Sequence, residues 1–476
     1  MTGTQRPIRG WIARPAARGL GVLTAAALAA ATIGRPEPVP AQSHGGGGPP
    51  IIRDAETEQL LRDYTQPILK VAGLAKQNIH VVIINDRSFN AFVADGQRIF
   101  INAGALMQAK TPNEVIGVLA HESGHIAGGH LARLREQLAT ASTESLVAMM
   151  LGIGALVAGA RSGGGSAGDL GAAALSAPQA IIQNSLLAYV RTQEEQADRA
   201  GVKFLTATGQ SPKGMYDTFK RLSDEMLYQA RYINPYMQTH PMPSERVAAL
   251  EELIKGNPYW DKKDPPELQM RHDLMRAKLS GFMERSEISA NRYPASDQSL
   301  PARYARAIAA MRFGDSRSAL AQIDALIQAQ PQNPYFHELK GQALLEAGRA
   351  TEAIAPLRQA VAGAPNPTLI QIMLGQALIE SNNKAYIDEA VTMLQAASAR
   401  EPESIDAFAQ LAMAYGRKGD NAHADLASAQ AALLRGDIKA AHMLADRAKG
   451  RFPVGSPGWV KADDITSYKP PRRVAN

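Results

Sequence analysis

The sequence predicts a mixed α+β domain followed by an all-α solenoid of helical repeats. From residue 51 to about residue 264, β-branched runs alternate with amphipathic helical patterns. From about residue 300 the pattern is wholly helical, and it repeats every 34 residues. The 476 residues are too many for one core, and with 45% hydrophobic and 20% charged residues they suit folded domains.

The first 41 residues have the order of segments that is typical of a cleaved secretory signal. Four arginines precede an alanine-rich apolar run from Leu20 to Ile33, and the small-residue site Val39-Pro40-Ala41 follows. This run is shorter than the roughly 20 residues that a spanning helix needs. We therefore expect export to a bacterial periplasm, with 1–41 as signal peptide and 42–50 as a flexible linker; an uncleaved anchor is the alternative.

Charge and cysteine content exclude several classes of function. The formal charge is +6, but residues 1–41 hold five arginines and one glutamate, so the rest has 46 basic and 44 acidic residues. A nearly balanced chain gives no electrostatic reason to expect a nucleic acid partner. The chain has no cysteine, which excludes disulfides, thiolate metal sites and cysteine nucleophiles.

Strand and turn signals define the α+β domain. Asn78–Ile84 and Arg98–Asn102 are strand-like, and the turn signal Asp95-Gly96 between Phe92 and Phe100 predicts a small hairpin or meander. Prolines after the charged run at 262–264 mark the end of the region. We expect this domain to span 51–265, and a bridging helix and linker to span 266–299.

The 34-residue period appears at three separate landmarks. The pairs that share it are Gly314 and Gly348, Gly341 and Gly375, and Pro331 and Pro365. The pattern resembles the tetratricopeptide repeat, a helical hairpin that buries its apolar face only against a neighbour. We expect four units over 300–453, the last one degenerate, and a tail over 454–476; a generic helical bundle is the alternative.

The strongest chemical signal lies on one predicted helix. Thr111 can cap this helix, Pro112 suits its first position, and Glu114 can close a capping box. His121 and His125 follow, four residues apart, so both project from one face and can share a metal ion.

Glu122 lies about 100° around the same helix, where its carboxylate can reach a metal-bound water rather than the metal. This H-E-x-x-H arrangement is what a zinc hydrolase needs, because two neutral imidazoles hold the ion and a carboxylate takes the proton from its water. A pair of surface histidines is the alternative, but the flank at 115–120 is apolar and places the motif beside a core.

A third ligand is expected from a second helix. On a continuous helix His130 would lie opposite His121, so we interpret it as a structural or supporting residue. Glu194 and Asp198 fall on an apolar stripe, where a carboxylate is costly without a partner such as zinc. Glu194 can complete the site, and Asp198 can orient a ligating histidine. An ordinary salt-bridged helix face is the alternative.

The motifs at 121–125 (HESGH) and 194–198 (EEQAD) resemble the paired motifs H-E-x-x-H and E-x-x-A-D of the HtpX-like zinc metallopeptidases. The signal-bearing form with C-terminal repeats resembles the BepA-like branch, periplasmic proteases of the outer-membrane assembly pathway. The resemblance covers nearly the whole mature chain. It implies a zincin-like (gluzincin-type) metalloprotease domain followed by an all-α tetratricopeptide-repeat solenoid, with one Zn²⁺ per chain.

The resemblance also implies roles for further residues. Asn90–Phe92 and Ile101–Leu106, which include Asn102, correspond to the family's substrate-binding edge-strand region. His240 and Arg246 match the ends of its H-P-x-x-x-x-R stretch. We expect His240 either to take the open zinc position in a latent state or to stabilise the oxyanion, with a plain loop histidine as the alternative, and Arg246 to be structural.

An apolar segment, Leu146–Ala160, lies between the two metal motifs, where integral-membrane relatives have membrane spans. It is too short for a comfortable span. We expect 146–168 to form a lid or a membrane-surface element over the cleft that limits access for folded proteins; a core helix is the alternative.

These signals predict a zinc-dependent endopeptidase that cleaves unfolded or misassembled envelope polypeptides. Zinc would be held by His121, His125 and Glu194, while Glu122 moves the proton and the substrate pairs as a strand near Asn102. The repeats would dock a partner or substrate, which the resemblance suggests is the outer-membrane assembly machinery. The alternatives are a periplasmic chaperone or scaffold with a latent metal site, and a hydrolase for a non-peptide substrate.

Overall fold

An α+β domain and an all-α region make up the described part of the chain. The computed structural model describes residues 50–94, 96–133, 190–228, 236, 240–241 and 244–470. The predicted signal peptide, residues 42–49 of the linker and the apolar segment 146–168 lie outside the described residues. Among the described residues, no helix has the length and apolar character needed to cross a membrane.

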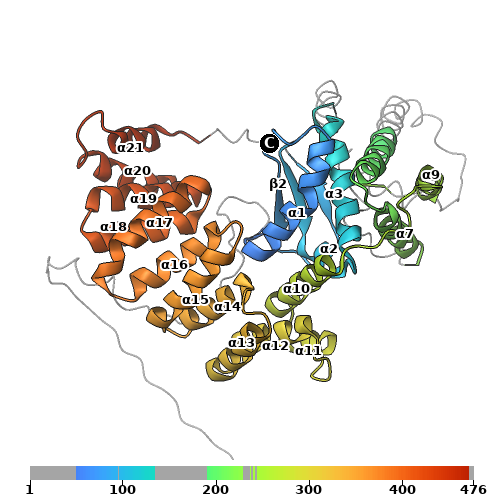
Figure 1. Ribbon diagram of the computed structural model, residues 1–476. Helices are drawn as coiled ribbons and strands as arrows, with labels where there is room; N and C mark the ends of the chain where they lie inside the picture. Colours follow the sequence, from blue (N-terminus) through green and yellow to red (C-terminus); the bar gives the residue numbers. More distant parts are fainter. Residues whose placement is uncertain are drawn as a thin grey trace, which may run out of the picture. The chain divides into compact units, whose positions relative to one another are not determined.

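A four-stranded sheet lies at the centre of the α+β domain (Figure 1). Its strands are β1 (Ile51–Ile52), β2 (His80–Ile84), β3 (Ala91–Val93) and β4 (Arg98–Asn102), in the order β1-β2-β4-β3. The inner strands β2 and β4 are parallel, and each outer strand is antiparallel to its neighbour. The predicted hairpin is β3–β4, in which Phe92 pairs with Phe100 and Gly96 has the positive φ of +80° that the turn requires.

Helices pack around this sheet and enclose one core. They are α1 (Ala55–Val71), α2 (Ala103–Gln108), α3 (Pro112–Ala127), the helical residues 190–207, α7 (Lys213–Tyr228) and α9 (Ser244–Ile254). α3 contacts α1, α7 and the strands β3 and β4. Buried side chains such as Tyr64, Leu106 and Phe219 fill the space between these elements. Core packing therefore holds α3 in place on several sides.

The start of α3 follows the sequence prediction with one difference. Thr111 accepts a hydrogen bond from the backbone N–H of Glu114 at 3.4 Å, and Pro112 begins the helix. The Glu114 carboxylate accepts from the N–H of Lys110 at 3.2 Å and not from that of Thr111. The box thus closes one residue earlier than predicted, but the helix begins where expected.

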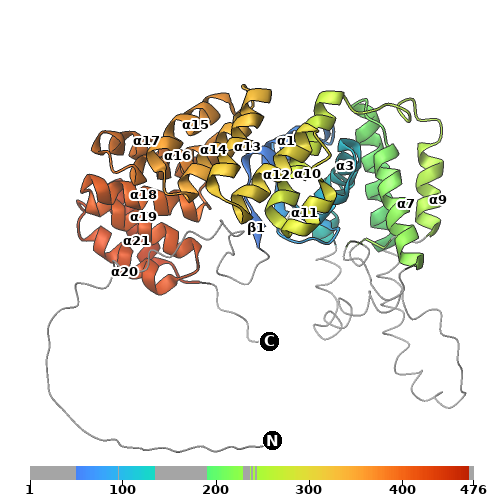
Figure 2. The ribbon, with the colours of Figure 1, turned by 90° about the horizontal axis from the view of Figure 1, so that it is seen from below.

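In the described residues a bridging helix and eleven further α-helices follow (Figure 2). They are α10 (Pro266–Met283), α11 (Ser286–Arg292), α12 (Leu300–Phe313), α13 (Ser316–Ala329), α14 (Pro334–Glu346), α15 (Ala350–Gly363), α16 (Thr368–Glu380), α17 (Ile387–Arg400), α18 (Ile405–Lys418), α19 (Asn421–Leu434), α20 (Ile438–Lys449) and α21 (Pro457–Ser467). Each helix from α12 onward packs against the next. The described residues thus contain five successive helix pairs, one more than the four units predicted.

The expected tail contains the last of these helices. Ser456 caps α21, and Ala462 and Ile465 are buried against α19 and α20. The difference has a physical reason, because the final pair of a solenoid would otherwise leave an apolar face uncovered.

Gly341 and Gly375, one pair of the 34-residue period, lie at close contacts between helices. A Cβ atom at Gly341 would lie 2.4 Å from the Leu357 side chain, and one at Gly375 would lie 2.7 Å from that of Leu394. Each of these two glycines thus lets the first helix of its pair approach the second, which explains why glycine occupies the same position in both units.

A buried charge cluster connects the α+β domain to the first repeats. We call it the junction cluster. Lys278 on α10 lies 2.5 Å from Asp54, 3.3 Å from Glu56 and 3.5 Å from Glu338, and Tyr304 donates a hydrogen bond to Glu56. Burial lowers the pKa of Lys278, but the three carboxylates more than offset this and hold the pKa well above its usual value. One cation therefore holds acids from α14 and from the start of α1 together.

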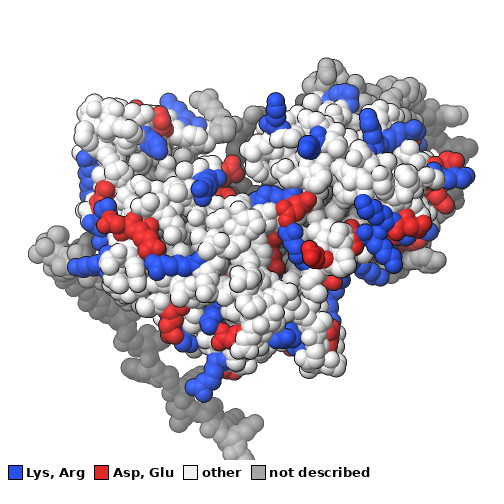
Figure 3. Space-filling view, in the orientation of Figure 1, with Lys and Arg blue, Asp and Glu red and all other residues white. Residues whose placement is uncertain are grey.

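Charges of both signs are interspersed on the face of the molecule in Figure 3. Within the repeats, charged side chains also pair between helices: Arg358 of α15 with Glu389 of α17 at 2.8 Å, and Lys418 of α18 with Asp388 of α17 at 2.7 Å. The net positive charge is thus not concentrated on this face.

Candidate metal centre

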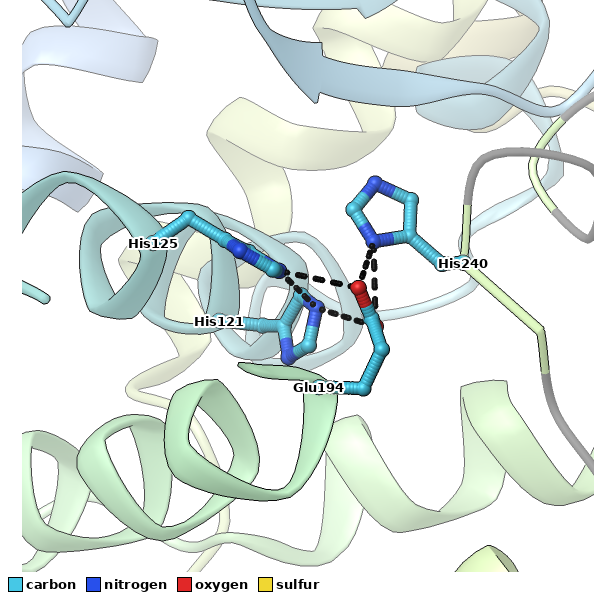
Figure 4. Close-up of side chains that lie close together, drawn as sticks. All are labelled: His121, His125, Glu194 and His240. Carbon is cyan, nitrogen blue, oxygen red and sulfur yellow. Dashed lines mark hydrogen bonds and ion pairs between the residues drawn. The ribbon is translucent and has the colours of Figure 1, made fainter. Parts of the chain in front are cut away.

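Four side chains from three segments converge in the α+β domain (Figure 4). His121 and His125 come from α3, Glu194 from the helix at 190–207, and His240 from the segment that precedes α9. Their potential ligand atoms all lie within 4.8 Å of one another, and His121, Glu194 and His240 are buried. The structure thus brings together the three predicted metal ligands and the predicted fourth residue.

The spacing within this group fits one metal ion. Nε2 of His121 is 3.1 Å from Nε2 of His125, and each of these atoms is 3.4 Å from a carboxylate oxygen of Glu194. Two ligands about 2.0–2.1 Å from a tetrahedral zinc ion lie about 3.3 Å apart. Three lone-pair donors at such distances suit a divalent cation at their centre.

Close helix packing puts Glu194 in reach of the two histidines. A Cβ atom at Gly124 would lie 2.8 Å from the carbonyl oxygen of Ala197, so only glycine allows the helix at 190–207 to approach α3 this closely. Ala197 is fully buried at this contact. The glycine inside the H-E-x-x-H motif therefore determines the distance between the two motifs.

Asp198 and Arg246 support the ligands from behind. Asp198 lies 2.9 Å from Nδ1 of His121, as the sequence predicted, and Arg246 donates to both of its oxygens at 2.6 and 2.8 Å. Arg246 also pairs with Glu194 at 2.7 Å. Burial raises the pKa of Asp198, but Arg246 and His121 lower it to about 2. Asp198 is therefore ionised and can hold Nδ1–H of His121, which leaves Nε2 free for a metal.

His130 lies beside His125, because α3 does not continue to it. The helix ends at Ala127, and Gly129 adopts a positive φ of +62°. The expectation of a position opposite His121 assumed a continuous helix and is wrong. Nδ1 of His130 lies 2.9 Å from Nδ1 of His125.

Glu122 is fully buried, and neither of its carboxylate oxygens has a hydrogen-bond partner among the described residues. Burial raises its pKa, against the attraction of His240 and His121. A buried carboxylate without donors is costly. Since no hydrogen bond from the described residues uses these oxygens, they remain available to a metal-bound water.

His240 contacts both carboxylates of the centre. Its Nδ1 lies 3.1 Å from each oxygen of Glu194, and its Nε2 lies 3.5 Å from Glu122. Its ring stacks on Tyr236, with the ring centroids 4.6 Å apart. Sequence reasoning did not identify Tyr236; its position four residues before His240 was the available signal.

Asn102 does not lie where a substrate strand could pair. It ends β4, an inner strand that is paired with β2 on one side and β3 on the other. Its backbone N–H donates to the carbonyl of Asn90, and its side chain donates to Ser88 at 3.0 Å. The expectation of pairing at Asn102 is therefore corrected, because among the described strands β3 forms the edge beside α3.

Known proteins share both parts of this architecture. Residues 55–254 match peptidase family M48, and residues 304–367 match a tetratricopeptide repeat. The chain is 24% identical over 419 residues, 86% of its length and 82% of the relative's, to a β-barrel assembly-enhancing protease of Escherichia coli. It is 27% identical over 200 residues, 41% of its length and 72% of the relative's, to metalloprotease LoiP of E. coli. It is 25% identical over 187 residues, 39% of its length and 50% of the relative's, to mitochondrial metalloendopeptidase OMA1 of Schizosaccharomyces pombe.

The domain that carries the four converging side chains is thus that of a metallopeptidase. Its residues 55–254 match the model of peptidase family M48, and 86% of the chain is similar to a β-barrel assembly-enhancing protease, with a tetratricopeptide repeat match at residues 304–367. The predicted fold class is confirmed, as is the prediction of a metallopeptidase, and the resemblance to the BepA-like proteases agrees with these similarities.

Proposed function

We propose that the protein is a zinc-dependent endopeptidase that cleaves unfolded or misassembled envelope polypeptides. The observation that carries the proposal is the triangle of His121, His125 and Glu194 beside Glu122, whose carboxylate accepts no hydrogen bond from the described residues. Two imidazoles and one carboxylate form a ligand set typical of catalytic zinc. A bound zinc ion would supply a Lewis acid that polarises the scissile carbonyl and lowers the pKa of water.

The side chains around the proposed zinc position have three further roles: proton transfer, orientation of the ligands, and control of the open coordination position. Glu122 takes the proton of the attacking water on its carboxylate and passes it to the leaving amine. Asp198 and Arg246 hold His121 and Glu194 in place. His240 is within reach of both carboxylates, so it can either close the centre in a latent state or donate to the oxyanion.

The position of β3 at an edge of the sheet supports the proposal of an extended, unfolded substrate. β3 pairs with β4 on one side and contacts α3, the helix of the two histidines. We propose that an extended substrate segment pairs with the other side of β3 through main-chain hydrogen bonds. This mode favours unfolded polypeptides, because folded proteins rarely offer a free strand.

The repeats are proposed to dock a partner or substrate. The similarity to β-barrel assembly-enhancing proteases supports a role in outer-membrane protein quality control, and the predicted signal peptide supports a periplasmic location. Part of the repeat region is already occupied, since Arg53 pairs with Glu401 at 2.9 Å and Ala55 packs within the core of the repeats. A partner would therefore bind elsewhere on the solenoid. Membrane-surface contact by 146–160 stays a prediction.

Metal analysis combined with proteolysis tests the central proposal. The purified protein should hold one zinc per chain and cleave unfolded casein. Glu122→Gln should keep the metal and lose about 10²- to 10⁴-fold in rate, because it removes a general base. Glu195→Gln, an exposed change next to Glu194, is the control and should behave as wild type. Zinc-free active protein, or full activity in Glu122→Gln, would contradict the proposal.

A chaperone or scaffold with a latent metal centre is the second candidate, and the contact of His240 with Glu194 favours it. His240→Ala separates the two roles of this histidine. If His240 blocks the centre, proteolysis rises; if it stabilises the oxyanion, kcat falls while zinc binding stays the same. Suppression of aggregation by Glu122→Gln as effective as by wild type would support the scaffold.

A further inference from the structure

One nitrogen of each predicted histidine ligand points away from the metal position, and each meets a different partner. Nδ1 of His121 meets the carboxylate of Asp198 at 2.9 Å. Nδ1 of His125 meets Nδ1 of His130 at 2.9 Å, and Nε2 of His130 meets Oε1 of Gln196 at 3.2 Å. His130 is almost fully buried. A chain of three side chains therefore leads from the end of α3 to the helix that carries Glu194.

The directions of these hydrogen bonds follow from the atoms at the end of the chain. The amide oxygen of Gln196 only accepts, so Nε2 of His130 must carry the proton that lies between them. In a neutral imidazole the other nitrogen then has a free lone pair, and Nδ1 of His130 is an acceptor. Nδ1 of His125 must therefore donate, and Nε2 of His125 keeps the lone pair that faces Glu194 and His121.

We propose that His130 is a positioning residue of the metal centre, which Gln196 fixes in the tautomer that turns the metal-binding lone pair of His125 inward. The proposal rests on the proposed function, since it assigns His125 as a ligand. It also gives the two ligands different support: an anion for His121 and a neutral imidazole for His125. A neutral partner orients His125 without adding a further negative charge beside Glu122, Glu194 and Asp198.

The local backbone is shaped for this contact. A Cβ atom at Gly128 would lie 2.3 Å from Nε2 of His130, so only glycine leaves room for the ring. Gly129, with φ at +62°, reverses the chain and brings His130 back over His125. Gln193 adds a second contact from the facing helix, where its side chain donates to the carbonyl of His130 at 3.4 Å. The turn and the helix thus hold His130 from both sides.

Two replacements of His130 separate orientation from packing. His130→Asn keeps an acceptor close to the position of Nδ1, and His130→Leu keeps apolar bulk without an acceptor. Gln196→Leu removes the amide that fixes the tautomer, at an exposed position where folding is little affected. Glu195→Gln, the exposed neighbour, is the matched control.

The primary measurement is the zinc dissociation constant from competition with a chromophoric chelator. The absorption spectrum of the cobalt-loaded protein reports the geometry of the ligands independently of proteolysis. We expect His130→Leu to weaken zinc binding about 10- to 100-fold and to change the cobalt spectrum. His130→Asn should restore most of the affinity, and Gln196→Leu should lie between the two.

Equal zinc affinity in wild type, His130→Leu and Gln196→Leu would overturn the proposal. Equal losses in His130→Leu and His130→Asn, with Gln196→Leu as wild type, would show that the ring only fills space and would overturn it as well. If His130→Leu does not fold, the comparison of Gln196→Leu with Glu195→Gln decides in the same way. A wild-type protein that binds no zinc would instead remove the proposed function itself.

Discussion

Two buried polar clusters, the metal centre and the junction cluster, differ in how the desolvation free energy of their carboxylates is offset. In the junction cluster Lys278 lies within 3.5 Å of Asp54, Glu56 and Glu338, so the chain supplies its own cation. In the metal centre Arg246 neutralises part of the charge, but Glu122 accepts no hydrogen bond from the described residues, and the atoms of the three predicted ligands face a common point. The junction cluster contains its own cation, whereas the metal centre presents ligand atoms that could hold a metal ion.

This difference between the two clusters indicates whether a buried carboxylate stabilises the fold or binds a metal ion. Carboxylates that a lysine already satisfies hold elements together, because removing the lysine would leave uncompensated charge. Carboxylates and imidazoles that converge without such a cation provide a binding site. Stability and metal binding should therefore respond separately to changes in the two clusters.

The largest change in stability is expected at the junction cluster. Lys278→Met leaves three carboxylates without a cation and should lower the free energy of unfolding by about 3–5 kcal/mol. Lys340→Met is the control: its ammonium lies 2.7 Å from Asp324 at a partly exposed site, and its loss should change stability by less than about 1 kcal/mol. Urea unfolding followed by circular dichroism measures both, and equal small losses would contradict the comparison.

The next effect concerns the metal centre alone. Zinc at about 1,000 times its dissociation constant should raise the free energy of unfolding of the metal-free protein by about 4 kcal/mol. Glu194→Gln should remove most of this gain, whereas Glu338→Gln in the junction cluster should keep it. Thermal unfolding with and without zinc is the measurement. A gain that survives Glu194→Gln would place the ion elsewhere.

A smaller effect is expected from the support of His121. Asp198→Asn removes the charge that holds Nδ1–H of His121 and pairs with Arg246, and it should weaken zinc binding about 10- to 100-fold. Asp425→Asn is the matched control, because Asp425 is buried and paired with arginines in the repeats. Chelator competition gives both affinities, and an equal change in the two variants would argue against a specific role for Asp198.

The smallest effect is a pH dependence in the junction cluster. Burial raises the pKa of Glu338 to about 7, despite the nearby Lys278. A raised pKa means that the folded state holds this proton more tightly than the unfolded chain, so its contribution to stability is lost as pH rises from about 5 to about 7. Glu338→Gln cannot lose a proton, so its stability relative to wild type should rise by roughly 1–2 kcal/mol over this window. A difference that stays constant with pH would contradict the assignment.

Local sequence patterns were sufficient to predict those elements whose structure depends on interactions between residues close in sequence. The capped helix that places His121 and His125 on one face depends on 3.6-residue periodicity and on Thr111 and Pro112. The β3–β4 hairpin follows from its turn signal, and the repeats follow from a 34-residue period in which Gly341 and Gly375 lie where paired helices touch. Glu194 could be selected because a carboxylate on an apolar stripe needs a partner.

Other features could not be predicted, because they depend on how distant segments meet. Strand order decided that β3 is the edge and Asn102 is internal, and the end of α3 at Ala127 brought His130 to His125. The junction cluster joins residues more than 200 positions apart with no shared motif. The sequence by itself determined which helices form and which chemistry they carry, since those depend on neighbours along the chain. Only the tertiary structure decided which side chains support the ligands, because that support depends on packing between helices.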